Sequence, residues 1–232
     1  MWTRLELKMR AKEAFRRNYW PCVIVAFVMA LINGLLSNSA SNSNSETNTT
    51  EMGEHGIAMF LAIYSIVAII AIIALVAKII IGNVLLVGGN RFFVINQTED
   101  AKVGTLLYGF KTGSVGNIVL VMFLRDLFTA LWTLLLIIPG IIKHYEYLMV
   151  PYILAENPDM CQRQAFAISK RMMQGQKMDV FILDMSFLGW KILEGLTLGI
   201  AGIFYVEPYY QATMAELYTA NRTSAYQSGY IR

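Results

Sequence analysis

The residues best suited to chemistry in this sequence are ionisable side chains that interrupt otherwise apolar segments. A charge at the centre of a bilayer costs roughly 2.5–3.5 kcal/mol, so such groups face the inside of a helix bundle and pair with one another. Grouped in this way, they could relay protons or bind an ion, a lipid headgroup or a peptide. The candidates for this midplane polar network are Arg125, Asp126, Lys143, His144, Glu146, Asp184, Lys191 and Glu207.

A structural role explains the same charges. In that interpretation they form ion pairs that fix the register of the helices, with Arg125 beside Glu146 or Asp184, and Asp126 beside Lys143. Neighbouring tyrosines suit either role, because their hydroxyls can satisfy buried carboxylates or line a pocket. These tyrosines are Tyr145, Tyr147, Tyr205, Tyr209 and Tyr210. Of the two interpretations we favour the structural one.

Motifs for catalysis or for metal binding are missing from the sequence. It contains no Gly-x-Ser-x-Gly, no His-Glu-x-x-His and no phosphate loop, and Gly88-Gly89 predicts a helix end or turn. His144 and Glu146 are two residues apart, so they do not share a helix face. Cys22 and Cys161 fit neither a disulfide framework nor a zinc pattern. We therefore expect no enzymatic activity, no cofactor and no metal.

The elements that would carry these residues are membrane helices. Apolar residues make up 56% of the chain and charged residues 15%, against about 25% charged residues in a soluble domain. The run 57–77 contains no charge and no proline, and about 20 apolar residues are enough to cross a hydrocarbon core of ~30 Å. The sequence predicts an all-α, polytopic membrane helix bundle. The net charge of +3 calls for no nucleic-acid partner.

We expect one membrane domain, residues 21–220, between a basic cytoplasmic lead helix (1–20) and a cytoplasmic tail (221–232). Pro139-Gly140 and Gly175 predict helix ends, Asn157-Pro158 predicts a helix start, and Pro208 could break the last span. Gly195 and Gly199 fit either a turn or a helix-packing motif. The predicted spans are about 21–36, 57–81, 117–138, 141–155, 178–194 and 200–220, with a mixed segment at 82–117 and a cytoplasmic surface helix at 159–174.

The distribution of Lys and Arg predicts the orientation. These residues concentrate in 1–18, 82–117, 156–177 and 221–232, whereas the polar segment 37–56 contains none. By the positive-inside rule, both termini are then cytoplasmic and 37–56 is a flexible outer loop. That loop contains Asn48-Thr49-Thr50, a formal glycosylation acceptor.

The start of the chain also has features of a cleaved signal peptide. A basic head, an apolar run and the small residues Ser39 and Ala40 occur in the order that such a signal requires. The basic head is long, however, and its charges are spaced as in a helix. We therefore expect a lead helix that stays with the protein.

Several short stretches together resemble a known family. They include Ile138-Pro139-Gly140-Ile141-Ile142-Lys143, Pro151-Tyr152-Ile153-Leu154-Ala155-Glu156-Asn157-Pro158, Ser186-Phe187-Leu188-Gly189-Trp190 and Ala215-Glu216-Leu217-Tyr218. The sequence is similar, from Leu7-Lys8 to Tyr218, to the bacterial integral membrane family catalogued as domain of unknown function 975. The resemblance implies a multi-pass protein of the bacterial plasma membrane with a six-helix type of bundle. It implies no activity.

The function we expect is therefore a non-enzymatic binding, accessory or scaffold role for a lipid, a peptide or a partner protein, including a second copy of the chain. Anionic lipid headgroups would contact the basic lead helix and the surface helix through Arg16, Arg17, Arg163, Lys170 and Arg171. Two alternatives stay open. One is a small transporter that uses the midplane charges, and the other is a membrane enzyme without a recognisable motif.

Overall fold

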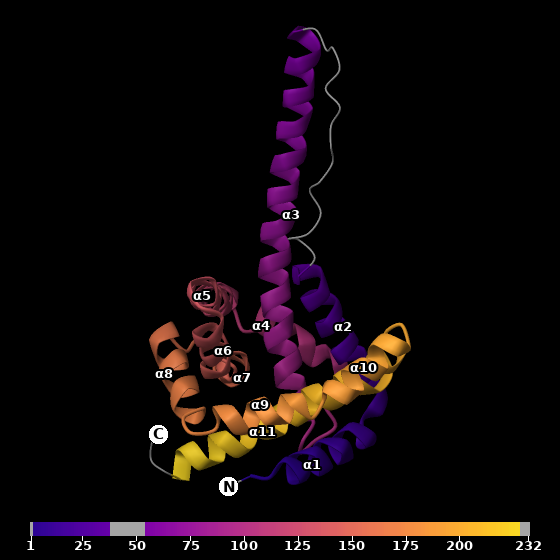
Figure 1. Ribbon diagram of the computed structural model, residues 1–232, viewed down its shortest axis with the longest axis vertical. Coiled ribbons are helices and arrows are strands. Elements are labelled where there is room, and N and C mark those ends of the chain that lie inside the picture. Colours follow the sequence, from indigo (N-terminus) through magenta and orange to yellow (C-terminus); the bar gives the residue numbers. More distant parts are fainter. Residues whose placement is uncertain (1, 38–53, 228–232) are drawn as a thin grey trace.

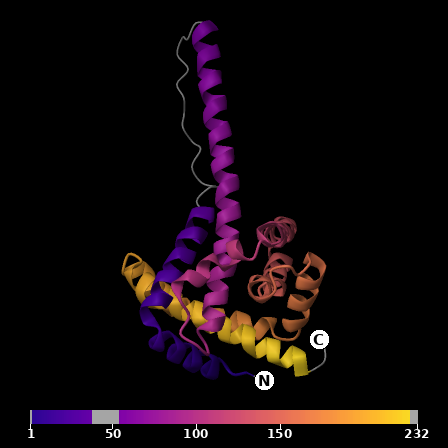
Figure 2. The same ribbon diagram turned by 180° about the vertical axis from the view of Figure 1, so that it is seen from behind.

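The computed structural model of this protein describes residues 2–37 and 54–227, and every regular element within these ranges is a helix. One helix, α3 (Glu54–Ile95), stands upright, and its N-terminal part projects beyond the rest of the molecule (Figure 1). The other helices gather beside its C-terminal part and across its base (Figure 2). The all-α prediction is confirmed for the described residues.

Helix α3 is much longer than the predicted span 57–81. Its 42 residues correspond to about 63 Å at a rise of 1.5 Å per residue, roughly twice the thickness of a hydrocarbon core. Many large apolar side chains are exposed between Ile63 and Ile81, whereas Val84, Val87 and Phe92 are buried in the body of the protein. The first part of the predicted mixed segment 82–117 is therefore a continuation of helix α3.

A glycine inside α3 allows a close approach by the short helix η2 (Val103–Leu107). A Cβ atom added to Gly88 would lie 2.0 Å from the carbonyl oxygen of Leu106, so no other residue fits there without a backbone shift. The expected helix end at Gly88-Gly89 is wrong, and packing explains the glycine instead. The chain continues through α4 (Tyr108–Lys111).

The lead helix and the first predicted span are α1 (Arg4–Arg17) and α2 (Tyr19–Ser37), which meet at a bend of 107°. Helix α1 lies across the base beside the C-terminal helix α11 (Figure 1). Its buried residues Leu7, Ala11 and Phe15 form one stripe, since they are spaced three to four residues apart. The rest of its surface is largely polar and basic.

Helix α5 (Val115–Leu135) is seen nearly end-on in both views, so it lies across α3 (Figures 1 and 2). The extended backbone of Leu136 then turns the chain into α6 (Ile137–Glu146). The break comes a few residues before Pro139-Gly140. A Cβ on Gly140 would lie 2.6 Å from the Cα of Thr133, so this glycine permits the tight packing of α5 on α6.

Beyond α7 (Val150–Glu156), the predicted surface helix appears as α8 (Gln162–Met172). It begins after Cys161, because Asn157-Pro158 belongs to a turn in which the Met160 N–H donates to the Asn157 carbonyl at 3.1 Å. The predicted start at this pair is wrong. Gly175 follows the helix with a positive φ of 78°, and the predicted stop at this glycine is confirmed.

The last part of the chain crosses the base twice. Helices α9 (Lys177–Met185) and α10 (Leu188–Leu196) run outward, and Gly199, with φ of 87°, lies in the turn that reverses the chain. A π-helical segment, η3 (Gly202–Val206), leads into α11 (Glu207–Gln227), which returns along the base (Figure 1). Of the two interpretations of Gly195 and Gly199, the turn is the one observed.

Within the described residues, two helical stretches are long and apolar enough to cross a membrane, Val76–Ile95 and Val115–Leu135, or three if the bent pair α1–α2 counts as one span. The six predicted spans are not confirmed. The stretches 141–155 and 178–194 are each divided into two helices of at most 10 residues, about 15 Å long and too short to cross.

The sixth predicted span, 200–220, is replaced by η3 and the polar helix α11. The predicted outer loop 37–56, with its glycosylation acceptor, lies outside the described residues except for Ser37 and the start of α3. The described ends of the chain, the start of α1 and the end of α11, both lie at the base (Figure 1).

Candidate functional site

The most buried ion pair in the described residues centres on Glu146, at the end of α6. Its side chain is 7% exposed and accepts hydrogen bonds from Lys143 Nζ at 2.6 Å and from Lys177 Nζ at 2.5 Å. Burial by itself would raise the pKa of Glu146, but the bonds from the two lysines outweigh it and lower that pKa. Ser169 of α8 donates to the Glu146 carbonyl at 2.7 Å. The cluster therefore joins α6, α8 and α9.

A second carboxylate, Asp184 of α9, is held by two tyrosines. Tyr145 of α6 donates to it at 2.8 Å, and Tyr210 of α11 donates to the other oxygen at 3.1 Å. Burial raises the pKa of both phenols, and the adjacent carboxylate raises it further, so both hydroxyls remain protonated donors. These two tyrosines satisfy a half-buried carboxylate, which is close to one of the roles predicted for them.

The other candidate charges interact with close sequence neighbours, except Lys191, whose Nζ lies 5.5 Å from the centre of the Tyr210 ring. Arg125 donates to the adjacent Asp126 at 2.6 Å, and Glu207 accepts from Gln211 at 2.9 Å. His144 is exposed on α6 and makes an edge contact with the Tyr145 ring. The expected pairs between Arg125 and Glu146 or Asp184, and between Asp126 and Lys143, are wrong.

A small cavity of about 190 Å³ lies where α2, α3, α5, α7 and α11 meet. Methionines, among them Met29, Met122 and Met214, form much of its apolar lining. Its polar lining includes Arg125 and Tyr210, and the Tyr210 hydroxyl is bonded to Asp184. The cavity therefore brings one cation and one of the Asp184 tyrosines to the centre of the bundle.

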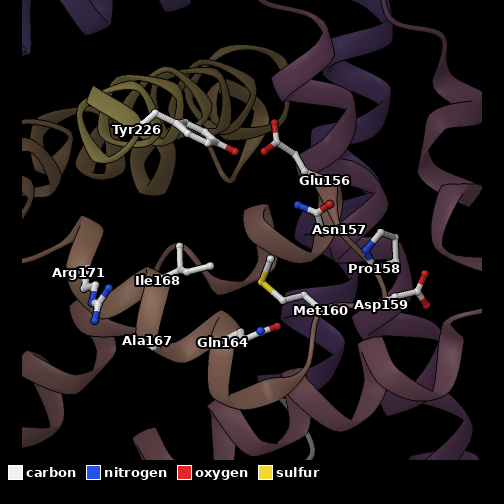
Figure 3. A pocket seen from close by; sticks show the side chains of 10 residues that line it. All are labelled: Glu156, Asn157, Pro158, Asp159, Met160, Gln164, Ala167, Ile168, Arg171 and Tyr226. Atoms are coloured by element: carbon white, nitrogen blue, oxygen red, sulfur yellow. The ribbon is translucent and has the colours of Figure 1, made fainter. Parts of the chain in front are cut away.

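A wider cleft of about 720 Å³ separates α8 from the end of α11 (Figure 3). Glu156 and Tyr226 point toward each other along one side, and Arg171 of α8 lies on another. The two carboxylates of the cleft are engaged, since Glu156 accepts from Arg222 and Tyr218, and Asp159 accepts from Ser114. Arg171 is exposed and pairs with no other described residue, so it gives the cleft a positive charge.

All five predicted headgroup contacts have exposed side chains, and four of them make no ion pair with a described residue: Arg16 on α1 and Arg163, Lys170 and Arg171 on α8. Arg17 differs, because its guanidinium donates to Asp100 at 3.0 Å and to the Asn96 carbonyl at 2.6 Å. Arg17 therefore ties α1 to the end of α3.

Sequence patterns did not predict two long-range contacts, that of Lys177 with Glu146 and that of Trp2 with Gln176 and Asn221. Lys177 was placed only in a basic segment, and nothing in its spacing connects it with Glu146, 31 residues earlier. Trp2 donates to both Gln176 and Asn221, at 2.6 and 3.0 Å, and so fixes the start of the chain to the base. Such contacts between distant segments leave no periodic signal.

The clusters at Glu146 and Asp184 and the cleft beside α8 all draw on the C-terminal part of the chain. Residues 133–224 match the model of the family described as Protein of unknown function (DUF975). This match confirms the resemblance, and the stretches that carried it from Ile138 to Tyr218 fall inside the matched region. Leu7-Lys8 precedes it. No curated protein and no solved structure matches the chain.

The matched region contains Lys143, His144, Glu146, Asp184 and Glu207, but Arg125 and Asp126 lie before it. It also contains all of α8 and its three basic residues. The ion-paired cluster, and the cleft except for Tyr226, are thus built from the matched segment, whereas α1 to α4 and most of α5 precede it.

Proposed function

We propose that this chain is a non-enzymatic, multi-pass protein of the bacterial plasma membrane that binds anionic lipid headgroups and offers a binding surface to a lipid, a peptide or a partner protein. One observation carries the proposal. The apolar, exposed part of α3 projects from one end of the molecule, while the basic helix α1 lies at the other end (Figure 1). Large exposed apolar surfaces of this kind mark contact with a membrane or a partner.

In the proposed arrangement, α3 crosses the bilayer with α2 beside it, whereas α5, which lies across α3, runs along the membrane and not through it. The base, with both described ends of the chain, faces the cytoplasm, where anionic lipids attract Lys and Arg at about 1 kcal/mol each. Arg16, Arg163, Lys170 and Arg171 contact phosphates, and the cleft beside α8 accepts the bound group or peptide.

Lipid binding tests this proposal directly. The purified protein would be exchanged into detergent with phosphatidylglycerol or phosphatidylcholine, and retained lipids counted by native mass spectrometry. The double variant Lys170→Gln/Arg171→Gln should retain fewer phosphatidylglycerol molecules. The matched control Lys102→Gln/Lys111→Gln removes two equally exposed charges elsewhere and should retain as many as the unaltered protein. Equal retention by both variants, or no preference for the anionic lipid, would contradict the proposal.

A second candidate function, small-molecule transport, has one observation in its favour, the cavity that Arg125 and Tyr210 line. Glu146→Gln and Asp184→Asn separate the two candidates. If these charges are architecture, both variants lose thermal stability and keep whatever lipid the protein binds. If they form a relay, stability is retained while a co-purified small molecule or a proton-coupled flux is lost.

A further inference from the structure

The turn from α5 into α6 is unusually apolar for a surface turn. Residues 134–138 are consecutive leucines and isoleucines, all with exposed side chains, and Leu134 is 85% exposed. No acidic or basic residue occurs from 127 to 142. Runs of consecutive exposed apolar residues are unfavourable in water, so this turn faces an apolar medium or a partner.

The turn between α10 and η3 has the same character. Leu196, Leu198 and Ile200 have exposed side chains, and Leu198 is 93% exposed. Leu198 also has a positive φ of 52°, a conformation that glycine adopts freely and leucine only at a cost. A turn in water gains nothing from a leucine in this conformation, whereas an apolar medium would stabilise its side chain.

The outer face of α5 continues the first of these turns. A stripe of exposed apolar residues runs along it, opposite the buried Ile118, and consists of Leu120, Phe123, Leu127, Leu131 and Leu134. Beside the stripe, the hydroxyls of Thr129 and Thr133 donate to the carbonyls four residues earlier, at 2.8 Å each, so they need no water. A helix that is apolar on both its inner and its outer face, with its hydroxyls satisfied internally, is suited to lipid.

The level of α5 along α3 follows from Gly109 of α4, which lies against both Val84 of α3 and Ile118 of α5. Val84 comes within one turn of Ile81, where the exposed apolar stretch of α3 ends. In both views α6 and α7 lie between α5 and the base (Figures 1 and 2). Helix α5 therefore lies at the level where α3 leaves the body and its surface becomes apolar.

The turn after α10 lies on the opposite side of α3 from α5, higher than α9 (Figures 1 and 2). On this side Tyr19, at the start of α2, donates to the Phe204 carbonyl of η3 at 3.0 Å, and the exposed apolar residues of α2 begin at Trp20. Trp190 of α10 and Tyr205 of η3 pack with ring centres 5.3 Å apart. Tyr and Trp gather at the boundary between a membrane and water, so these aromatic residues are typical of that level.

We propose that the outer face of α5, the α5–α6 turn and the α10–η3 turn are embedded in the acyl chains of the leaflet nearest the base, as two apolar anchors on opposite sides of α3. This placement rests on the proposed function, because it takes α3 as a helix that crosses the same bilayer. Acyl chains are the occupant because they surround α3 on every side. A second copy of the chain or a single partner would cover one side of α3 and leave the other anchor in water.

Spin labels on single cysteines test the placement in the full chain, reconstituted into vesicles of phosphatidylglycerol and phosphatidylcholine. A Cys161→Ser background leaves only the buried Cys22. Electron paramagnetic resonance then compares collisions of each label with oxygen, which concentrates in lipid, and with a water-soluble nickel chelate. The test variants are Leu120→Cys, Leu127→Cys, Leu134→Cys and Leu198→Cys, with Ile73→Cys on α3 as the lipid control and Lys12→Cys on α1 as the aqueous control.

We expect all four test labels to collide more with oxygen than with the chelate, at a depth of about 5–10 Å below the headgroups. The labels at Leu120, Leu127 and Leu134 should share one depth, because α5 lies along the membrane. If α5 instead crossed the bilayer, the first and last of these labels would differ in depth by about 21 Å, at 1.5 Å per residue, and the placement would be overturned.

The lipid control separates failure of this placement from failure of the proposed function. If the Ile73 label collides mainly with the chelate, α3 does not cross the bilayer and the proposed function fails. If the Ile73 label lies in lipid while the label at Leu134 or at Leu198 collides mainly with the chelate, only the placement of the anchors is overturned. Shielding of either label from both reagents would mean that protein covers that turn, which also overturns it.

Discussion

Each carboxylate in the two clusters of the matched region accepts a hydrogen bond from at least one other helix, so each one joins neighbouring helices. Glu146 takes one lysine from its own helix and another from α9, and Asp184 takes tyrosines from α6 and α11. Removing one member of a buried ion pair leaves an uncompensated charge, which is strongly destabilising. These residues therefore contribute to stability whatever else they do.

Gly88 is the residue whose replacement the packing tolerates least. Gly88→Ala places a methyl group 2.0 Å from the Leu106 carbonyl oxygen, and overpacking of this kind costs about 1–3 kcal/mol. We expect a clearly lower melting temperature in detergent. Gly104→Ala on η2 is the matched control, because nothing lies within 4 Å of the added atom, and it should melt at or above the temperature of the unaltered protein. Equal melting of the two variants would show that α3 and η2 do not pack closely.

Glu216 should make stability fall as the pH rises. Burial raises its pKa above 4.5, and Arg10 opposes this only in part. Glu216 lines a hollow between α1 and α11, and the other charged groups that line this hollow are Glu13 and Arg17. The unfolded chain loses this proton near pH 4.5, before the folded one does. The free energy of unfolding therefore decreases from about pH 4.5 up to the folded pKa, and below that range the penalty is absent.

Glu216→Gln removes this penalty. The variant should be more stable than the unaltered protein at pH 7, and the difference should shrink as the pH approaches 4.5. Thermal melts between pH 4 and pH 8 would measure it, with the exposed Glu99→Gln as the control. A variant that is less stable at every pH would mean that the ionised carboxylate has a partner.

At the scale of the elements, Asp184 is the point that joins α6, α9 and α11. Tyr145→Phe and Tyr210→Phe each remove one hydrogen bond to a charged acceptor, at a cost of about 1.5–3 kcal/mol. Tyr147→Phe is the control, since its hydroxyl has no hydrogen-bond partner among the described residues. Denaturant titrations of the two single variants and the double variant should show that the second loss costs less than the first. Strictly additive losses would mean that the two tyrosines act independently.

The helical elements were predictable where one physical signal dominates. The helix at 57–77 could be predicted because a long apolar run is visible in the sequence, and the helix stop at Gly175 could be predicted because glycine adopts a positive φ easily. Pro139-Gly140 and Pro151 lie within a few residues of the breaks at Leu136 and at 147–149, but the exact positions of these breaks could not be predicted, since they depend on how α6 packs on its neighbours. For the same reason the pairing of Lys177 with Glu146 could not be read from the sequence, whereas the pair Glu6–Arg10 could.

On the scale of the whole molecule, polarity is separated along one axis. The apolar part of α3 projects at one end, and the polar face of α1, the polar α11 and the described ends of the chain lie at the other (Figure 1). The orientation proposed above, which follows the positive-inside rule, places this basic end in the cytoplasm. The orientation can therefore be tested with one reporter on the base and one in the segment expected to lie outside.

The native Cys161 provides the reporter on the base. Cys161 is exposed in the turn before α8, whereas Cys22 is buried, so a maleimide that cannot cross membranes should modify only Cys161. In intact cells we expect no labelling of Cys161, and full labelling once the cells are permeabilised. Ser43→Cys in a Cys161→Ser background places the thiol in the segment without Lys or Arg, and should be labelled in intact cells.

The opposite pattern would place the base and α8 outside the cell, where anionic headgroups of the cytoplasmic leaflet could not reach Lys170 and Arg171. That result would contradict cytoplasmic lipid binding through Lys170 and Arg171. Labelling of both cysteines in intact cells would mean that Cys161 and Ser43 lie on the same side, and α3 could not then be a single crossing between them.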